Sequence, residues 1–173
     1  ISRTGIITNE RMQTNLPNVY AVGDVTGTSL LAHSASRMGE VAVDAILGKK
    51  SIMRYDAVPW AVYSLPEAAG CGLTEEQARE RGVNVRSASV QMRSNGRFLA
   101  EHGKKAGGLC KVVVDGDTDL LLGVHLVGGA ASEMIYGAAS LMEAELRVRE
   151  IKDIIFPHPS VSEIIKDALW ALS

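Results

Sequence analysis

Cysteine is scarce in this sequence. Of its 173 residues only Cys71 and Cys110 are cysteines, and they form no Cys-X-X-Cys pair. Closely spaced cysteines are what a zinc site or a dithiol redox motif requires, so neither is predicted here. Two distant cysteines are more typical of buried small side chains than of a disulfide framework. The sequence therefore predicts no metal site.

Long apolar runs and a strong excess of one charge are also missing. No apolar run approaches the roughly 18–20 residues of a membrane-spanning helix. The formal net charge is −2, which provides neither the basic surface that binds nucleic acid nor a polybasic membrane patch. We expect neither nucleic acid nor a membrane among the partners. Hydrophobic residues make up 46% of the sequence, enough for an ordinary globular core.

The N-terminus lacks an initiator methionine and a targeting signal. Residues 1–10 (ISRTGIITNE) have neither a basic segment nor an apolar stretch of the kind that directs secretion. We expect a chain that begins in the middle of a longer sequence. Its length suits one domain or slightly more than one.

Near the C-terminus, the segment FPHPSVSEIIK places His158 between Pro157 and Pro159. The prolines predict a stiff, non-helical segment, and Ser160 is predicted to cap a helix in a capping box with Glu163. Histidine with a carboxylate that orients its ring is typical of acid–base chemistry. On these residues alone, a plain structural role also stands: Glu163 only caps the helix and His158 only occupies a loop.

A second candidate site follows residues 19–22, an apolar run that predicts a strand buried on both faces of a parallel sheet. Gly23 and Asp24 follow at once, at the carboxyl end of the strand, where ligands of such sheets bind. The Asp24 carboxylate could accept hydrogen bonds from ligand hydroxyl groups. A simple Gly-Asp turn is the alternative.

A helix is predicted over residues 30–47, ended by Gly48. Its first turn contains Leu31, Ala32 and His33, whose backbone N–H groups lack intrahelical acceptors and could donate to ligand oxygens. For His33, an ordinary residue at a helix start is the alternative.

Composition changes near residues 48–56, where we place a domain boundary. Beyond it, the pattern predicts strands over 58–63, 83–92, 109–115 and 120–127, and helices over 74–81 and 132–146. Residues 116–119 give a hairpin signal, and the apolar phase slips between Val85 and Ala88, which predicts a bulge or an edge. The fold class that follows is α+β, a mostly antiparallel sheet flanked by helices.

Five blocks of sequence occur in an order that resembles a known family. They are TNLPNVYAVGDVTG, LLAHSASRMGE, LPEAAGCGLTEEQA, LLGVHLVG and HPSVSE. Together they resemble the C-terminal part of the flavin-dependent disulfide oxidoreductases, and within that family the dihydrolipoamide dehydrogenase branch. The resemblance implies that residues 1–51 are the tail of an α/β FAD-binding domain and that residues 52–173 form the dimerisation domain.

For the first domain, the resemblance implies contacts with FAD. Asp24 would bind the ribityl chain, and Gly23 would allow close approach. Leu31, Ala32 and His33 would lie near the flavin ring and act through backbone groups.

For the second domain, the resemblance implies that His158 and Glu163 form the acid–base pair and that the histidine reaches across a two-fold interface into the partner's active site. The implied reaction oxidises dihydrolipoyl groups with FAD and an active-site disulfide, then passes hydride to NAD. The implied partners are a second copy of the chain and the lipoyl-bearing acyltransferase of a 2-oxo acid dehydrogenase complex. The implied location is the cytoplasm, or the mitochondrial matrix in a eukaryote.

This sequence departs from the family in one respect. The dinucleotide fingerprint, the NAD domain and the redox cysteine pair, which the family places upstream, do not occur in these 173 residues. We therefore expect these residues alone to be inactive. A non-catalytic dimerisation module, or part of another disulfide reductase such as glutathione reductase, remains an alternative.

Overall fold

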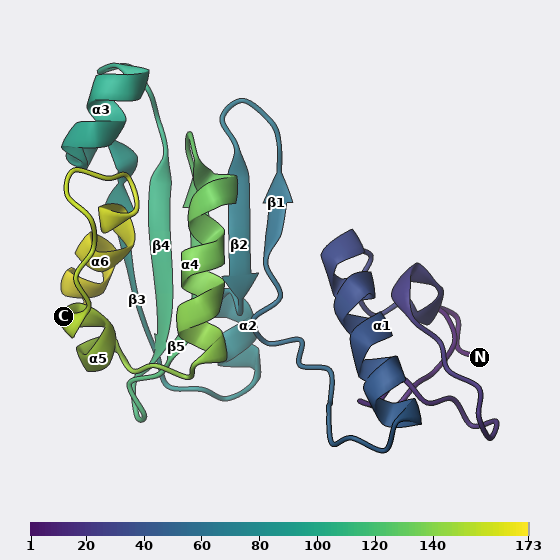
Figure 1. The fold of residues 1–173 in the computed structure, drawn as a ribbon. Helices are drawn as coiled ribbons and strands as arrows, with labels where there is room; N and C mark the ends of the chain where they lie inside the picture. The colour runs from purple at the N-terminus through teal and green to yellow at the C-terminus, as the bar shows by residue number, and fades with distance from the viewer. Residues whose placement is uncertain (173) are drawn as a thin grey trace. The chain divides into compact units, whose positions relative to one another are not determined.

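The computed structural model describes residues 1–172 and divides the chain into two compact units, Ile1–Tyr55 and Asp56–Ser173 (Figure 1). The first unit holds the 3-10 turn η1 (Gly23–Thr26) and the helix α1 (Ala32–Ile46) among extended and turn segments. The predicted helix over residues 30–47 is confirmed. It ends where Gly48 adopts φ +76°, a left-handed conformation that glycine takes at little cost.

The strand predicted over residues 19–22 is wrong. Tyr20 makes only an isolated bridge with Gln13, and the side chains of Val19 and Val22 are 45% and 38% exposed. A strand buried on both faces needs paired neighbours and a covering layer on each side. The described residues of the first unit supply only the one bridge and leave Val19 and Val22 uncovered, so the apolar run does not form a strand.

The second unit is built on a five-stranded antiparallel sheet in the order β1-β2-β5-β4-β3. Its strands are β1 (Trp60–Val62), β2 (Ala68–Gly72), β3 (Val85–Gln91), β4 (Leu109–Asp115) and β5 (Leu121–Val127). The predicted hairpin joins β4 to β5, and the strand with the slipped pattern, β3, is an edge strand as expected. The register shift lies elsewhere, between Val113 and Val114 of β4.

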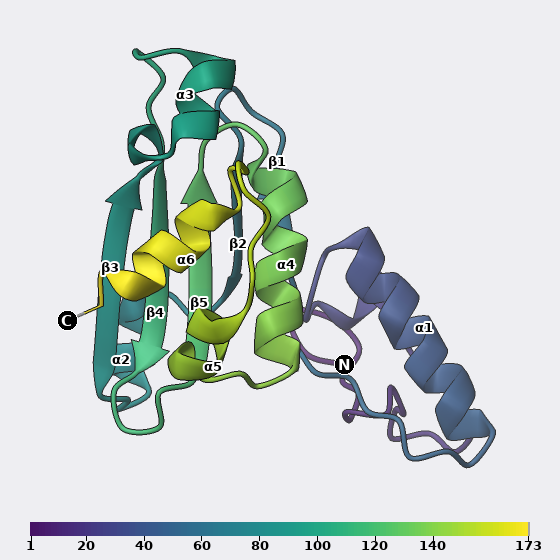
Figure 2. The ribbon, with the colours of Figure 1, turned by 60° about the vertical axis from the view of Figure 1, so that its left-hand side comes forward.

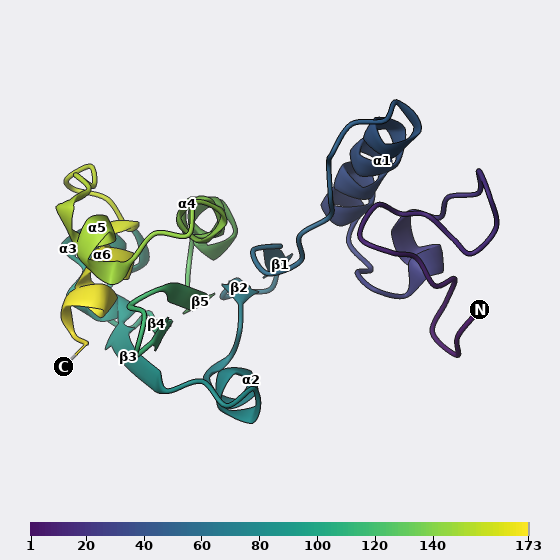
Figure 3. The same ribbon diagram turned by 90° about the horizontal axis from the view of Figure 1, so that it is seen from below.

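Helices cover the sheet unequally. Three of them lie on one face: α4 (Ala131–Glu143), α5 (Val148–Asp153) and α6 (Glu163–Trp170) (Figure 2). Seen from below, α2 (Glu75–Glu80) lies on the opposite face (Figure 3). A short helix that the sequence analysis did not predict, α3 (Gly96–His102), follows the 3-10 turn η2 (Met92–Ser94) at the end of the sheet where β3 stops. The antiparallel α+β prediction is confirmed.

One hydrophobic core joins the sheet to α4 and α6. It includes Val112 and Val124 from the sheet and Ile164 and Leu169 from α6, all with no exposed surface. Burying each such side chain contributes about 1.5–3 kcal/mol. This packing fixes the rotation of α6 on the sheet, and it thereby fixes the direction in which the first residue of the helix points. No helix in the described part of the chain is long and apolar enough to cross a membrane.

Candidate functional site

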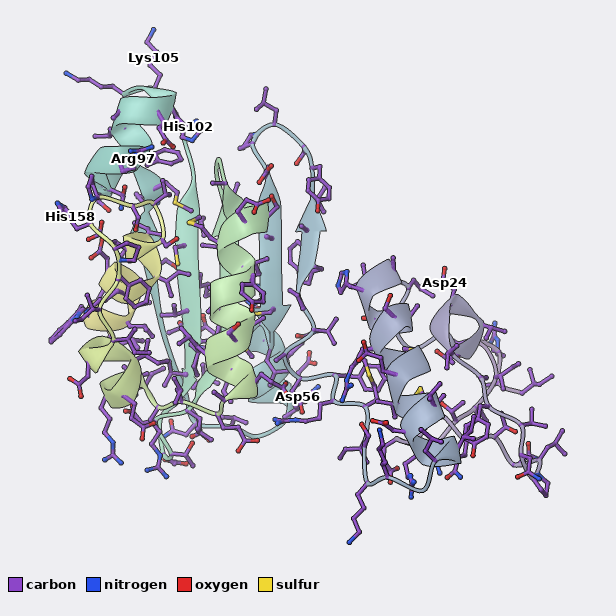
Figure 4. The ribbon with its side chains drawn as sticks, in the orientation of Figure 1. Asp24, Asp56, Arg97, His102, Lys105 and His158 are labelled. Atoms are coloured by element: carbon purple, nitrogen blue, oxygen red, sulfur yellow. The ribbon has the colours of Figure 1, made fainter. Side chains whose placement is uncertain are left out.

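His158 and Glu163 meet in the second unit. Nδ1 of the imidazole lies 3.0 Å from Oε1 and 3.2 Å from Oε2 of the carboxylate. Glu163 is the first residue of α6, while His158 lies on the loop before it, with its side chain 82% exposed and directed away from the sheet (Figure 4). Because Nδ1 faces the carboxylate, Nε2 is the atom that can exchange a proton with a molecule arriving from outside.

The loop that carries His158 is held by hydrogen bonds at Ser160. Prolines flank the histidine, and the peptide bond between His158 and Pro159 is cis. The backbone N–H of Ser160 donates to Oε2 of Glu163 at 2.9 Å, and its carbonyl oxygen accepts from Nδ2 of Asn95 at 2.9 Å. The residue just beyond the Pro-His-Pro segment is therefore fixed through both of its backbone polar groups.

The predicted capping box is only half correct. The helix begins at Glu163, after Ser162, and the hydroxyl of Ser160 is buried with no hydrogen-bond partner among the described residues. An N-cap carbonyl must accept the first intrahelical bond. The Ser160 carbonyl is occupied by Asn95 instead, and the N–H of Ile164 donates to the carbonyl of Val161 at 3.1 Å. The helical hydrogen bonds thus begin at the Val161 carbonyl, and the helix begins at Glu163.

Electrostatics keep Glu163 ionised. The hydrogen bond from the Ser160 N–H, and then the contact with His158, lower the pKa of this carboxyl below its ordinary value of 4.5. A carboxylate that is charged at neutral pH stabilises a protonated imidazole and holds the ring in one orientation. The pair has the geometry of a general base with its orienting group.

In the first unit, Gly23 and Asp24 lie on η1, which packs against α1. Gly23 is buried with φ +76°, whereas Asp24 is exposed, and its carboxylate has no hydrogen bond or ion pair within the described chain. Leu31 precedes α1 without a side-chain cap, and Ala32 and His33 are exposed in the first turn. Figure 4 shows Asp24 at the end of this unit where α1 begins.

These five residues offer an exposed carboxylate and the uncapped N-terminus of a 15-residue helix at one end of a unit. The carboxylate can accept from hydroxyl groups, and the helix terminus can donate to anionic or carbonyl oxygens. This donor and acceptor set fits the ribityl and ring oxygens of FAD, the cofactor that the family resemblance implies. The predicted site residues thus form two groups, one in each unit.

The cysteines take no part in either group. Cys71 and Cys110 have no exposed surface, and burial raises the pKa of each thiol to about 12. Among residues 1–172, no cluster of His, Cys, Asp and Glu side chains could hold a metal ion.

The sequence analysis missed two residues of the second unit whose side chains hold helix ends and loops in place. Asn95 caps α3 and contacts the loop of His158, and an asparagine followed by a short amphipathic stretch was the available signal. Glu67 accepts from the N–H and the hydroxyl of Ser132 at 3.0 and 2.8 Å, which caps α4 from a distant loop. Because Glu67 and Ser132 are 65 positions apart, no local sequence pattern could have indicated this contact.

Comparisons with known proteins find matches over most of the chain. The family model for the pyridine nucleotide-disulphide oxidoreductase dimerisation domain matches residues 58–169, and the model described as pyridine nucleotide-disulphide oxidoreductase matches residues 1–39. A dihydrolipoyl dehydrogenase of Thermus scotoductus is 45% identical over 164 residues, 95% of this chain and 35% of the relative. The mitochondrial dihydrolipoyl dehydrogenase of Pisum sativum is 39% identical over 96% of this chain and 33% of its own length.

Two solved structures are similar to the fold of this chain. LpdA from Mycobacterium tuberculosis has a TM-score of 0.88 at 26% identity, covering 96% of this chain and 36% of that protein. The HOCl-induced flavoprotein disulfide reductase RclA from Escherichia coli has a TM-score of 0.84 at 29% identity, covering 100% of this chain and 40% of that protein. The chain spans about a third of the length of the curated relatives it matches. It belongs to the pyridine nucleotide-disulphide oxidoreductase family, and its second unit carries the dimerisation domain of that family.

Proposed function

We propose that this chain is part of a dihydrolipoyl dehydrogenase, which oxidises dihydrolipoyl groups with FAD and an active-site disulfide and reduces NAD. The contact between His158 Nδ1 and the Glu163 carboxylate, at 3.0 and 3.2 Å, is the observation that supports this role most directly. Two relatives of similar sequence are dihydrolipoyl dehydrogenases.

The proposed role of His158 is to remove a thiol proton. A thiol with a pKa near 8.5 is only about 3% ionised at pH 7, and the thiolate is the species that attacks a disulfide. Nε2 takes the proton, and Glu163 stabilises the resulting imidazolium through Nδ1. Ionising the whole thiol population gains about 30-fold, and general acid–base catalysis as a whole contributes about 10²–10⁴.

FAD would be held in the first unit. Asp24 would accept hydrogen bonds from the ribityl hydroxyls, Gly23 would allow the cofactor to approach the backbone, and the first turn of α1 at Leu31, Ala32 and His33 would face the ring. When bound, FAD supplies the hydride chemistry that links the disulfide to NAD.

A homodimer through residues 52–173 belongs to the same proposal. His158 is exposed at the margin of its own unit and so is available to a site in a second subunit. Exposed apolar side chains on β1, on the loop after it and on α4 (Val62, Tyr63, Leu65 and Tyr136) provide surface for the contact. The second proposed partner is the lipoyl-bearing acyltransferase of a 2-oxo acid dehydrogenase complex. The proposed location is the cytoplasm, or the mitochondrial matrix in a eukaryote, as the name of the pea relative states for that protein.

The experiment is His158→Gln in the full-length protein. We expect the rate of dihydrolipoamide-dependent NAD reduction to fall by about 10²–10⁴, with the content of bound FAD unchanged. His102→Gln is the matched control, because His102 is also exposed but its ring contacts Phe98 in a tilted arrangement, with 4.7 Å between ring centroids. Normal turnover in His158→Gln contradicts the proposed role.

Two further measurements test the alternatives, a glutathione-type reductase and a non-catalytic dimerisation module. Assays with dihydrolipoamide and with glutathione disulfide, each with NAD and NADP, separate a dihydrolipoyl dehydrogenase from a glutathione-type reductase. The mass of the intact protein separates a full enzyme from a dimerisation module: a mass near 18.5 kDa contradicts the enzyme, whereas a mass about three times larger supports it.

A further inference from the structure

Among the described residues of the second unit, Asn95 is the only polar residue that is buried as a whole, at 7% exposed. Both ends of its amide are satisfied. Oδ1 accepts the backbone N–H of Phe98 at 2.9 Å, which caps α3, and Nδ2 donates to the carbonyl oxygen of Ser160 at 2.9 Å. Both partners are backbone groups whose polarity cannot change, so the amide has one possible orientation.

A continuous series of hydrogen bonds runs from this amide to the imidazole. Nδ2 of Asn95 donates to the carbonyl of Ser160, the N–H of Ser160 donates to the carboxylate of Glu163, and that carboxylate accepts from Nδ1 of His158. The first two of these hydrogen bonds are partly buried and the third is exposed, and a connected series of hydrogen bonds restricts the motion of all its members. The loop from Phe156 to Ser162 has no regular secondary structure of its own, so it depends on such contacts for its position.

We propose that Asn95 is a positioning residue for the His158–Glu163 pair, an inference that rests on the function proposed above. Asn95 touches neither the imidazole nor the carboxylate. It fixes the backbone of Ser160, and it thereby fixes the distance between the proton-accepting ring and its orienting carboxylate. An error of about 1 Å in the placement of a catalytic group can cost about 10²-fold in rate.

The two atoms of the amide separate this role from helix capping. Asn95→Ser and Asn95→Asp both keep a side-chain oxygen for the N–H of Phe98, and both residues are good N-caps. Neither keeps the donor to Ser160, because serine is too short and aspartate presents a second oxygen to the carbonyl. A loss common to both variants therefore belongs to the contact with Ser160.

The test uses the full-length enzyme with four variants: Asn95→Ser, Asn95→Asp, His158→Gln and Thr74→Ala. Thr74 caps α2 by accepting the N–H of Gln77 at 3.2 Å, so Thr74→Ala removes a helix cap in the same unit without contacting the histidine loop. Turnover with dihydrolipoamide is compared with the oxidation of NADH by ferricyanide, which takes electrons from the flavin and bypasses the thiol step.

We expect both Asn95 variants to lose about 10- to 100-fold in thiol-dependent turnover, with ferricyanide reduction and FAD content kept. Their activity should recover as the pH rises above about 8.5, where solvent ionises the thiol without help from a base. Thr74→Ala should show a lower melting temperature and normal turnover. A general loss of structure would lower both reactions together and would not recover at high pH.

Two results overturn the inference, and they are distinct. If His158→Gln loses activity while Asn95→Ser and Asn95→Asp keep wild-type turnover and pH dependence, Asn95 does not position the pair. A parallel loss of both reactions in the Asn95 variants likewise assigns Asn95 to structure alone. If His158→Gln itself turns over normally, that result contradicts the proposed function and not the role of Asn95 alone.

Discussion

The backbone nitrogen of Ser160 lies 2.9 Å from Oε2 of Glu163, the same oxygen that lies 3.2 Å from Nδ1 of His158. One carboxylate thus fixes the loop and orients the imidazole at the same time. Since the Ser160 N–H is the larger cause of the lowered pKa of Glu163, the loop also keeps the carboxylate charged when His158 is neutral. The His158–Glu163 pair and the segment that carries it are therefore joined in one hydrogen-bonded unit.

The stability of the protein in acid should depend on Glu163. Its pKa is lower in the folded state than the ordinary value of 4.5, so the folded protein binds this proton less readily than the unfolded chain. The resulting stabilisation is fully present above about pH 4.5 and is lost as the pH falls through the folded-state pKa. Glu163→Gln should therefore lower the melting temperature most near neutrality, with a difference from wild type that shrinks toward pH 3.

The control for this measurement is Glu80→Gln, at an exposed position of α2. The measurement compares the melting temperatures of full-length wild type, Glu163→Gln and Glu80→Gln at several pH values between 3 and 7. A difference between Glu163→Gln and wild type that is the same at every pH contradicts the role of the charge.

Cys71 and Cys110 should resist alkylation in the native protein. Burial raises the pKa of both thiols to about 12, so at pH 8 only about one molecule in 10⁴ carries a thiolate at either position. Iodoacetamide followed by peptide mass analysis should leave both unlabelled while the protein is folded. Both should be labelled after denaturation in guanidinium chloride. Rapid labelling of either cysteine in the native state would contradict the burial described here.

Much of the second unit could be predicted from the sequence because its signals are local. The hairpin of β4 and β5 follows from two apolar runs around Gly116 and Asp117, and the helix predicted over residues 74–81 is found as α2, which Thr74 caps. The edge position of β3 was indicated by its interrupted alternation. These features depend on residues close together in the chain.

The errors arise where distant residues decide the structure. The first helical bond of α6 runs to the carbonyl of Val161, while the Ser160 carbonyl accepts from Asn95, 65 positions earlier in the chain. The strand predicted over residues 19–22 has the apolar composition of a buried strand, but in the described unit it makes only one isolated bridge, between Tyr20 and Gln13. The contact between His158 and Glu163 follows the predicted pairing, while the assignment of its catalytic role remains a prediction.

Tyr136 should be part of the dimer contact. Its side chain is 76% exposed on α4, in the unit that matches the dimerisation domain, and an exposed tyrosine is typical of interface anchors. In a two-fold dimer each substitution acts twice, so Tyr136→Lys places two cations at the contact. We expect the dimer dissociation constant to rise at least about 10-fold, measured by analytical ultracentrifugation of the full-length protein. Thiol-dependent turnover should fall with the dimer fraction, because the histidine is proposed to act in the partner's site.

The control is Glu80→Lys, which also adds a positive charge at an exposed helical position, on a helix of the opposite face of the sheet. This variant should stay dimeric and active. A Tyr136→Lys protein with wild-type dimer affinity would remove this face of α4 from the interface.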